Sequence, residues 1–141
     1  MKQKVRTIQA VVFVHETEDN KKIEDSIKKF LPDATIEKEK LVGHYDTTIE
    51  KISLKVEGKE LDEKLRELLS KIGAFEKGDI FSEIMKGMER NKIYLRLDKQ
   101  ELVKGLFKLD GDKQVKIVIT FNSEKDARDY FANQIGQISP L

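Results

Sequence analysis

The chain has no cysteine and no tryptophan, and histidine occurs only twice among its 141 residues. The absence of cysteine excludes disulfides, thiolate nucleophiles and thiolate metal ligands, and it is typical of a protein from the reducing cytoplasm. A zinc site would need both His15 and His44 together with carboxylates. The spacings HExxH, GxSxG, GxxxxGK[ST] and GxGxxG are also absent. We therefore expect a protein that is not an enzyme and that uses no cofactor or metal.

Long apolar runs and linker-like segments are missing as well. The apolar stretch from Ile8 to Val14 is too short to span a bilayer and has no small-residue cleavage site, so we interpret it as an ordinary first strand. The two prolines and eight glycines are scattered along the chain, and no internal repeat occurs. We predict a single domain covering residues 1–141, with no membrane contact and a cytoplasmic location.

Neither sign of charge is in excess, because 27 Lys and Arg residues stand against 26 Asp and Glu residues, for a net charge of +1. This balance excludes a protein that is held on nucleic acid by its total charge, so any nucleic-acid site must be local. Carboxylates are so frequent that most acidic neighbours carry no information about metals. Glu18, Asp19 and Asp98 are the trio that a metal-dependent hydrolase or nuclease would use, and we expect no such activity.

The apolar residues repeat with the period of a strand in some segments and with that of a helix in others. Strands are predicted at residues 5–14, 34–42, 49–56, 92–97 and 115–121. Helices are predicted at residues 17–31, 59–72, 80–88 and 123–135, with a short helical insert at 99–105. This order favours an α+β fold of two layers, in which helices pack on one face of a mainly antiparallel sheet of about five strands.

Three local signals set expected boundaries of these elements. Thr17 is the predicted N-cap of the first helix. Asp110-Gly111 predicts a hairpin turn before the last strand. Ser123 with Asp126 three residues later resembles a capping box and predicts the start of the last helix.

Positive charge gathers locally between residues 86 and 108. The basic residues there are Lys86, Arg90, Lys92, Arg96, Lys99, Lys104 and Lys108, against Glu89, Asp98 and Glu101. Tyr94 and Arg96 share one face of the predicted strand, where a ring can stack on a base while a guanidinium binds phosphate. A solvent-facing strand with ordinary charges would show the same pattern. His44 and Tyr45 form a second polar and aromatic pair in a predicted loop.

Three strings in the sequence resemble one known family. They are His15 followed by Thr17-Glu18-Asp19, the segment Gly43-His44-Tyr45, and Tyr94-Leu95-Arg96-Leu97-Asp98-Lys99-Gln100. Together they resemble the archaeal family of predicted RNA-binding proteins or predicted exosome subunits, over nearly the whole chain. The string RLDKQ is the most specific part. The residues that match are His15, Thr17, Glu18, Asp19, Gly43, His44, Arg96, Asp98, Lys99 and Gln100.

The resemblance implies a fold similar to that of ribosomal protein L5, RNA as the partner and the archaeal exosome as the setting. One segment departs from the family. The family continues with Gly-Asn-Pro-Ile where this chain has Asp46-Thr47-Thr48-Ile49, so this loop lacks the family's glycine and proline. The loop geometry, and any contact made through its backbone, should therefore differ.

The leading hypothesis is an RNA-binding module that uses the strand around Arg96. The residues expected to contact RNA are Lys92, Tyr94, Arg96, Lys99, Gln100, His44 and Tyr45. In this hypothesis Arg96 and Lys99 hold phosphates, Gln100 and His44 form hydrogen bonds with base edges or 2′-hydroxyls, and a tyrosine stacks on a base. Binding with so little charge should be weak and sensitive to salt.

The alternative is a protein-interaction or structural adaptor without RNA contact, in which the same residues maintain the fold. Asp98 would then pair with Lys99 or with a helix end, and His15 would form a hydrogen bond with the segment from Thr17 to Asp19. The sequence leaves the oligomeric state open.

Overall fold

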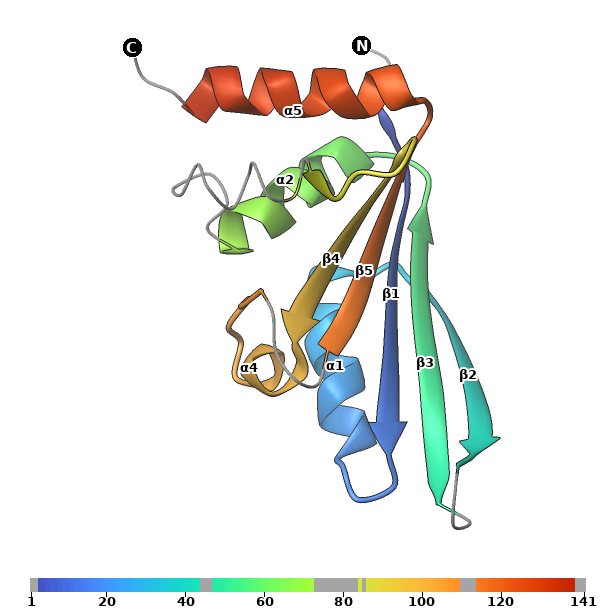
Figure 1. Ribbon diagram of the computed structural model, residues 1–141. Coiled ribbons are helices and arrows are strands. Elements are labelled where there is room, and N and C mark those ends of the chain that lie inside the picture. Colours follow the sequence, from blue (N-terminus) through green and yellow to red (C-terminus); the bar gives the residue numbers. More distant parts are fainter. Residues whose placement is uncertain (1–2, 44–46, 73–83, 85, 110–113, 139–141) are drawn as a thin grey trace. The chain divides into compact units, whose positions relative to one another are not determined.

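The computed structural model describes residues 3–43, 47–72, 84, 86–109 and 114–138, without the side chains of 133–138. The strands are β1 (Val5–His15), β2 (Thr35–Val42), β3 (Thr48–Glu57), β4 (Lys92–Asp98) and β5 (Gln114–Phe121). The helices in the described part are α1 (Asn20–Phe30), α2 (Leu61–Ile72), α4 (Lys99–Val103) and α5 (Glu124–Ile138). The strands form one antiparallel sheet in the order β2-β3-β1-β5-β4 (Figure 1). The predicted α+β fold with a five-stranded sheet is confirmed.

The strand boundaries follow the sequence pattern to within one residue at either end. β2 and β3 pair antiparallel, with Thr35 opposite Lys55 and Val42 opposite Thr48. The backbone N–H of Asp126 donates to the Ser123 hydroxyl at 3.0 Å, which confirms the cap of α5. The turn predicted at 110–111 and most of the helix predicted at 80–88 lie outside the described residues.

The prediction that Thr17 caps the first helix is wrong, because α1 begins later. Asp19 is the N-cap, and its carboxylate accepts a hydrogen bond from the backbone N–H of Lys22 at 3.1 Å. The residues before it are used in a turn, in which the Glu18 backbone N–H donates to the His15 carbonyl at 2.9 Å. A helix can start only after that turn is closed, and Asp19 is the next residue with a capping side chain.

Residue contacts divide the chain into two compact units. Unit 1 comprises residues 1–8, 57–95 and 118–141, and unit 2 comprises residues 9–56 and 96–117. β1, β4 and β5 each contribute residues to both units. The single domain over residues 1–141 stays a prediction.

Unit 1 has an aromatic cluster at its core. Phe121 of β5 lies 5.7 Å from the ring of Tyr130 and 6.1 Å from the ring of Phe131, both of which are buried on α5. The Tyr130 hydroxyl donates to the carbonyl of Asp62 at 2.9 Å, and burial raises the pKa of this phenol. The Asp62 carboxylate accepts from the backbone N–H of Val5 at 2.8 Å, so α2 is tied to both α5 and the start of β1.

Unit 2 packs its helices on one face of its strands. Along β1 the residues Ala10, Val12 and Val14 are buried, and they alternate with residues that are more exposed. The buried residues of the other elements are Ile23, Ile27 and Leu31 around α1, Ile52, Leu54 and Val56 of β3, Leu97 and Leu102 around α4, and Val115 and Ile117 of β5. The edge-to-face contact of Phe30 with Phe107, at 5.3 Å, places α1 and the segment after α4 on the same side. None of the helices in the described residues is long and apolar enough to cross a membrane.

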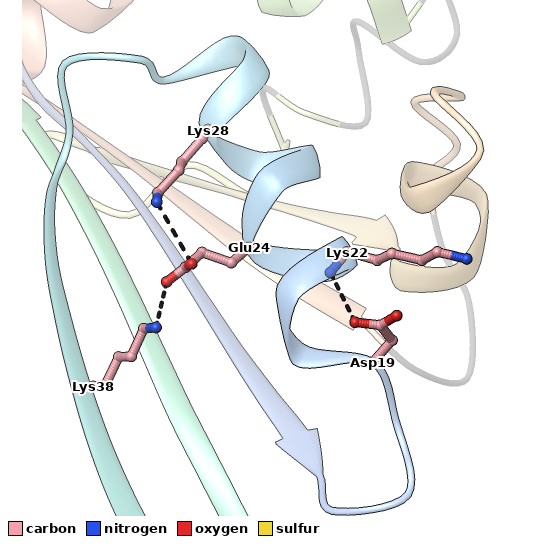
Figure 2. A network of polar contacts seen from close by, with 5 residues as sticks. All are labelled: Asp19, Lys22, Glu24, Lys28 and Lys38. Atoms are coloured by element: carbon pink, nitrogen blue, oxygen red, sulfur yellow. Dashed lines mark hydrogen bonds and ion pairs between the residues drawn. The ribbon is translucent and has the colours of Figure 1, made fainter.

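One carboxylate links α1 to the edge strand β2 of unit 2. Glu24 is 9% exposed, and its side chain lies 2.7 Å from the ammonium of Lys38 and 3.5 Å from that of Lys28 (Figure 2). The hydrogen bond from Lys38 lowers the pKa of the Glu24 carboxyl below its ordinary value of 4.5. The same contact raises the pKa of Lys38. Lys38 is opposite Ile52 in the hairpin, so its side chain lies on the helix-covered face of the sheet.

Replacing Glu24 by Gln should lower the free energy of unfolding near neutral pH by about 0.5–1 kcal/mol, because one partner remains half exposed. A carboxyl whose pKa is lowered in the folded state stabilises the fold above its ordinary pKa, and this contribution is lost as the pH falls through the folded value. Urea unfolding near neutral pH and at about pH 3 should therefore show a difference between the variant and the wild type that shrinks in acid. Asp25→Asn, at the neighbouring exposed position, is the control; a Glu24→Gln difference that persists in acid would contradict the assignment.

Candidate nucleic-acid interface

Strand β4 presents three of the predicted RNA contacts on its outer face. Ile93, Leu95 and Leu97 are buried, so the intervening residues Lys92, Tyr94 and Arg96 face away from the core. The side chains of Lys92 and Arg96 are exposed, and that of Tyr94 is half-buried. Lys92 and Tyr94 belong to unit 1, whereas Arg96 belongs to unit 2. The alternation predicted for this strand is therefore confirmed.

In unit 2, the sheet face opposite the buried residues is not covered by any helix in the described part of the chain. We call this surface the open face and define it by Phe13 and His15 of β1, Lys51 and Lys55 of β3, Arg96 of β4 and Lys116 of β5. Each of these residues alternates with a buried core residue of its strand. Four of the six side chains are basic at neutral pH. Glu37 and Glu39 of the edge strand β2 lie on the same face of the sheet, because they are directly opposite Ser53 and Lys51.

Phe13 is the residue on the open face that sequence reasoning missed. Its side chain is 48% exposed, which is unusual for a phenylalanine in the middle of a sheet. The run Val11-Val12-Phe13-Val14 is apolar at every position, so alternation alone does not show which face is buried. Gln9, Phe13 and His15 are separated by even numbers of residues, so their side chains point to the same face of the strand. Because Gln9 and His15 are polar, this spacing was the signal that predicts a solvent-facing ring at Phe13.

Lys99 was predicted to hold a phosphate, but its ammonium is engaged inside unit 2. The residue is only 3% exposed, and Nζ donates to the carbonyl of Phe13 at 2.8 Å. Nζ also lies 2.9 Å from Oε1 of Glu18, with which it forms an ion pair. A buried ammonium needs such partners, because an unpaired charge in the interior is costly. We therefore do not assign Lys99 to the outer surface.

The neighbours of Lys99 in the family-like strings also have roles in the fold. Asp98 is the N-cap of α4, and its carboxylate accepts from the backbone N–H of Glu101 at 3.0 Å. Oε1 of Glu18 also accepts from the backbone N–H of His15 at 3.0 Å. These are the kinds of contact that the structural alternative predicted for Asp98, with a helix end, and for His15, with the capping segment. Here it is the backbone of His15, at both its N–H and its carbonyl, that contacts Glu18.

The tertiary structure brings the two strings together around one hollow. Glu18 and Asp19 precede α1, whereas Lys99 and Gln100 begin α4, and all four line a hollow of about 330 Å³. Gln100 is exposed there. The predicted contacts His44 and Tyr45 lie outside the described residues. Among the residues that the structure describes, no three acidic or histidine side chains gather in a way that could hold a metal ion.

The fold and the open face define an α+β protein whose sheet leaves one surface of unit 2 available to a partner. A family model described as RNA binding matches residues 7–121, and the chain belongs to this RNA-binding family. The resemblance seen in the sequence strings is thus confirmed.

Relatives of the chain come from archaea. An uncharacterized protein of Methanocaldococcus jannaschii is 28% identical over 148 residues, which cover 94% of this chain and 99% of the relative. Among solved structures, a DUF54 protein from Methanothermobacter thermautotrophicus is 22% identical with a TM-score of 0.73, covering 96% of this chain and 98% of its own. A DUF54 protein from Sulfolobus solfataricus is 25% identical with a TM-score of 0.74, covering 93% and 98%. These structures show that the chain has the DUF54 fold.

Replacing Lys99 by Met should lower the free energy of unfolding by about 1–3 kcal/mol, because it leaves Glu18 and the Phe13 carbonyl without their buried donor. Urea unfolding would measure the change. Lys29→Met, at an exposed position of α1, removes the same charge and should have almost no effect. A Lys99→Met protein as stable as the wild type would show that this ion pair does not stabilise unit 2.

Proposed function

We propose that the chain binds single-stranded RNA on the open face of unit 2. The observation that carries the proposal is Phe13, a half-exposed ring on a sheet face that also presents four basic side chains. Aromatic rings on an open sheet stack on unpaired bases, and cations beside them hold the backbone. Bases in a duplex are already stacked on each other, so a ring in this position favours an unpaired strand.

Arg96 takes the leading phosphate role in this proposal. Its side chain is exposed on β4, and a guanidinium can bind phosphate with two parallel hydrogen bonds. Lys51 of β3 and Lys116 of β5 add positive charge on the same face. The contribution of Phe13 does not depend on charge, so binding can be local although the whole chain is nearly neutral. Affinity should still fall as salt rises, with a slope set by the few phosphates contacted.

The family supports RNA as the partner, and the finer parts of the sequence hypothesis remain proposals. A non-catalytic role is supported by the absence of the catalytic spacings from the sequence. A cytoplasmic location is supported by the absence of cysteine. Association with the archaeal exosome, and the similarity to ribosomal protein L5, stay predictions of the family resemblance.

Replacing Arg96 by Ala should weaken the binding of single-stranded RNA by roughly five- to tenfold at low salt and reduce the salt slope by about 1, because one phosphate contact is lost. Fluorescence anisotropy titrations at two salt concentrations would measure both quantities. Arg66→Ala, at an exposed position of α2 in unit 1, is the charge-matched control. Equal affinities for the two variants would place the RNA elsewhere.

Replacing Phe13 by Ala should weaken binding by about 1–3 kcal/mol, as expected for the loss of one stacked base, and should leave the salt slope unchanged because no charge is removed. Leu106→Ala is a suitable control, since Leu106 is an apolar residue of unit 2 that is 56% exposed and is not on the open face. The same anisotropy titration applies. If Phe13→Ala changed the salt slope and left low-salt affinity intact, stacking on this ring would be ruled out.

A further inference from the structure

The hollow between α1 and α4 shares no residue with the open face. Its walls are formed by residues of both helices and of the segments next to them. α1 contributes Ile23 and the side chain of Lys22, and α4 with the residue after it contributes Gln100, Val103 and Lys104. α4 ends at Val103 with Lys104 as its C-cap, and the following Gly105, with a φ of 87°, donates its backbone N–H to the carbonyl of Leu102 at 2.9 Å. The hollow therefore lies between two helix faces whose positions are fixed within unit 2.

The walls combine apolar surface with one uncharged hydrogen-bonding group. Ile23 and Val103 both line the hollow; Ile23 is only 4% exposed, so the half-buried Val103 supplies most of the accessible aliphatic surface. Gln100 carries both a donor and an acceptor on its amide. A volume of about 330 Å³ is at the small end for ligand sites and has room for one flat ring with its sugar. These dimensions and groups suit a nucleobase.

Charges of both signs line the hollow, from Glu18, Asp19, Lys22, Lys99 and Lys104. Glu18 is paired with Lys99 inside the unit, and Asp19 accepts a hydrogen bond at the start of α1. The ammonium of Lys104 lies 3.6 Å from the Glu101 carboxylate. Lys22 forms no ion pair in the described part of the chain. Figure 2 shows its side chain extending from α1 toward α4, away from the side of the helix where Glu24 meets Lys28 and Lys38.

We propose that this hollow takes up one unstacked base of a bound RNA strand, with Gln100 forming hydrogen bonds with the base edge and Lys22 holding a neighbouring phosphate. This inference rests on the RNA-binding function proposed above and adds a site at which a single base is enclosed. Val103 would contact the apolar surface of the base. Uptake of a base into this hollow favours RNA whose bases are unpaired, because a paired base would first have to leave its stack.

The first test fills the hollow and compares RNA with and without bases. Val103→Phe places a ring in the slot, and Val42→Phe makes the same change at a position that is 79% exposed at the end of β2. Anisotropy titrations would use an oligouridylate of about ten nucleotides and the same ribose–phosphate chain without its bases. We expect Val103→Phe to weaken oligouridylate binding roughly five- to 100-fold. Binding of the base-free chain, and of either RNA to Val42→Phe, should not change.

A second pair of variants tests the polar groups in case the filled hollow disturbs folding. Gln100→Ala should weaken oligouridylate binding at least threefold, on the order of one lost hydrogen bond, without affecting the base-free chain. Lys22→Ala should weaken both and reduce the salt slope by about 1. Lys29→Ala, at an exposed position of the same helix, should do neither. Thermal unfolding of each variant would show that the differences do not arise from loss of the fold.

The outcomes separate this inference from the proposed function. If Arg96→Ala weakens RNA binding and Val103→Phe, Gln100→Ala and Lys22→Ala do not, the base slot is overturned and the open face stands. If only the hollow variants weaken binding, the open face is overturned and the slot is supported. Wild-type protein that binds no RNA at low salt overturns both. Uridine monophosphate that binds as tightly as the oligonucleotide would identify a mononucleotide site and overturn the RNA slot.

Discussion

The buried ammonium of Lys99 joins segments of unit 2 that lie far apart in the sequence. Its two partners, the Phe13 carbonyl and the Glu18 carboxylate, are 86 and 81 positions away. Because the charge is nearly removed from water, the two contacts offset the cost of burying it. Glu18 also binds the backbone N–H of His15, so the same carboxylate closes the turn before α1.

The same ion pair determines which residues of the family-like strings reach the surface. Lys99 turns inward at the start of α4, and Asp98 is used as the cap of that helix. The residues on either side, Arg96 and Gln100, remain exposed. Arg96 lies on the open face, whereas Gln100 lines the hollow. A contiguous string that resembles one binding motif is thus divided between architecture and two distinct surfaces.

Neither of the two proposed surfaces requires a large net charge on the chain. The open face obtains its positive charge by alternation, which places basic side chains of β3, β4 and β5 opposite the core. Glu24 of α1 is paired with Lys38 on the helix-covered side of the sheet, whereas Glu37 and Glu39 of the edge strand lie opposite Ser53 and Lys51. Local separation of charge, with an exposed aromatic ring, provides what the balanced composition does not.

The sequence by itself determined the strands to within one residue, the α+β class, the cap at Ser123 and the outward direction of Arg96, because periodicity and capping depend on neighbours only a few residues apart. The sequence pattern wrongly predicted that Lys99 lies on the surface and that Thr17 is the N-cap of the first helix. It did not indicate that the ring of Phe13 is exposed. Only the tertiary structure decided these positions. The burial of Lys99 requires partners more than 80 positions away, and the exposure of Phe13 depends on which sheet face the helices cover. Local periodicity carries no information about such distant contacts.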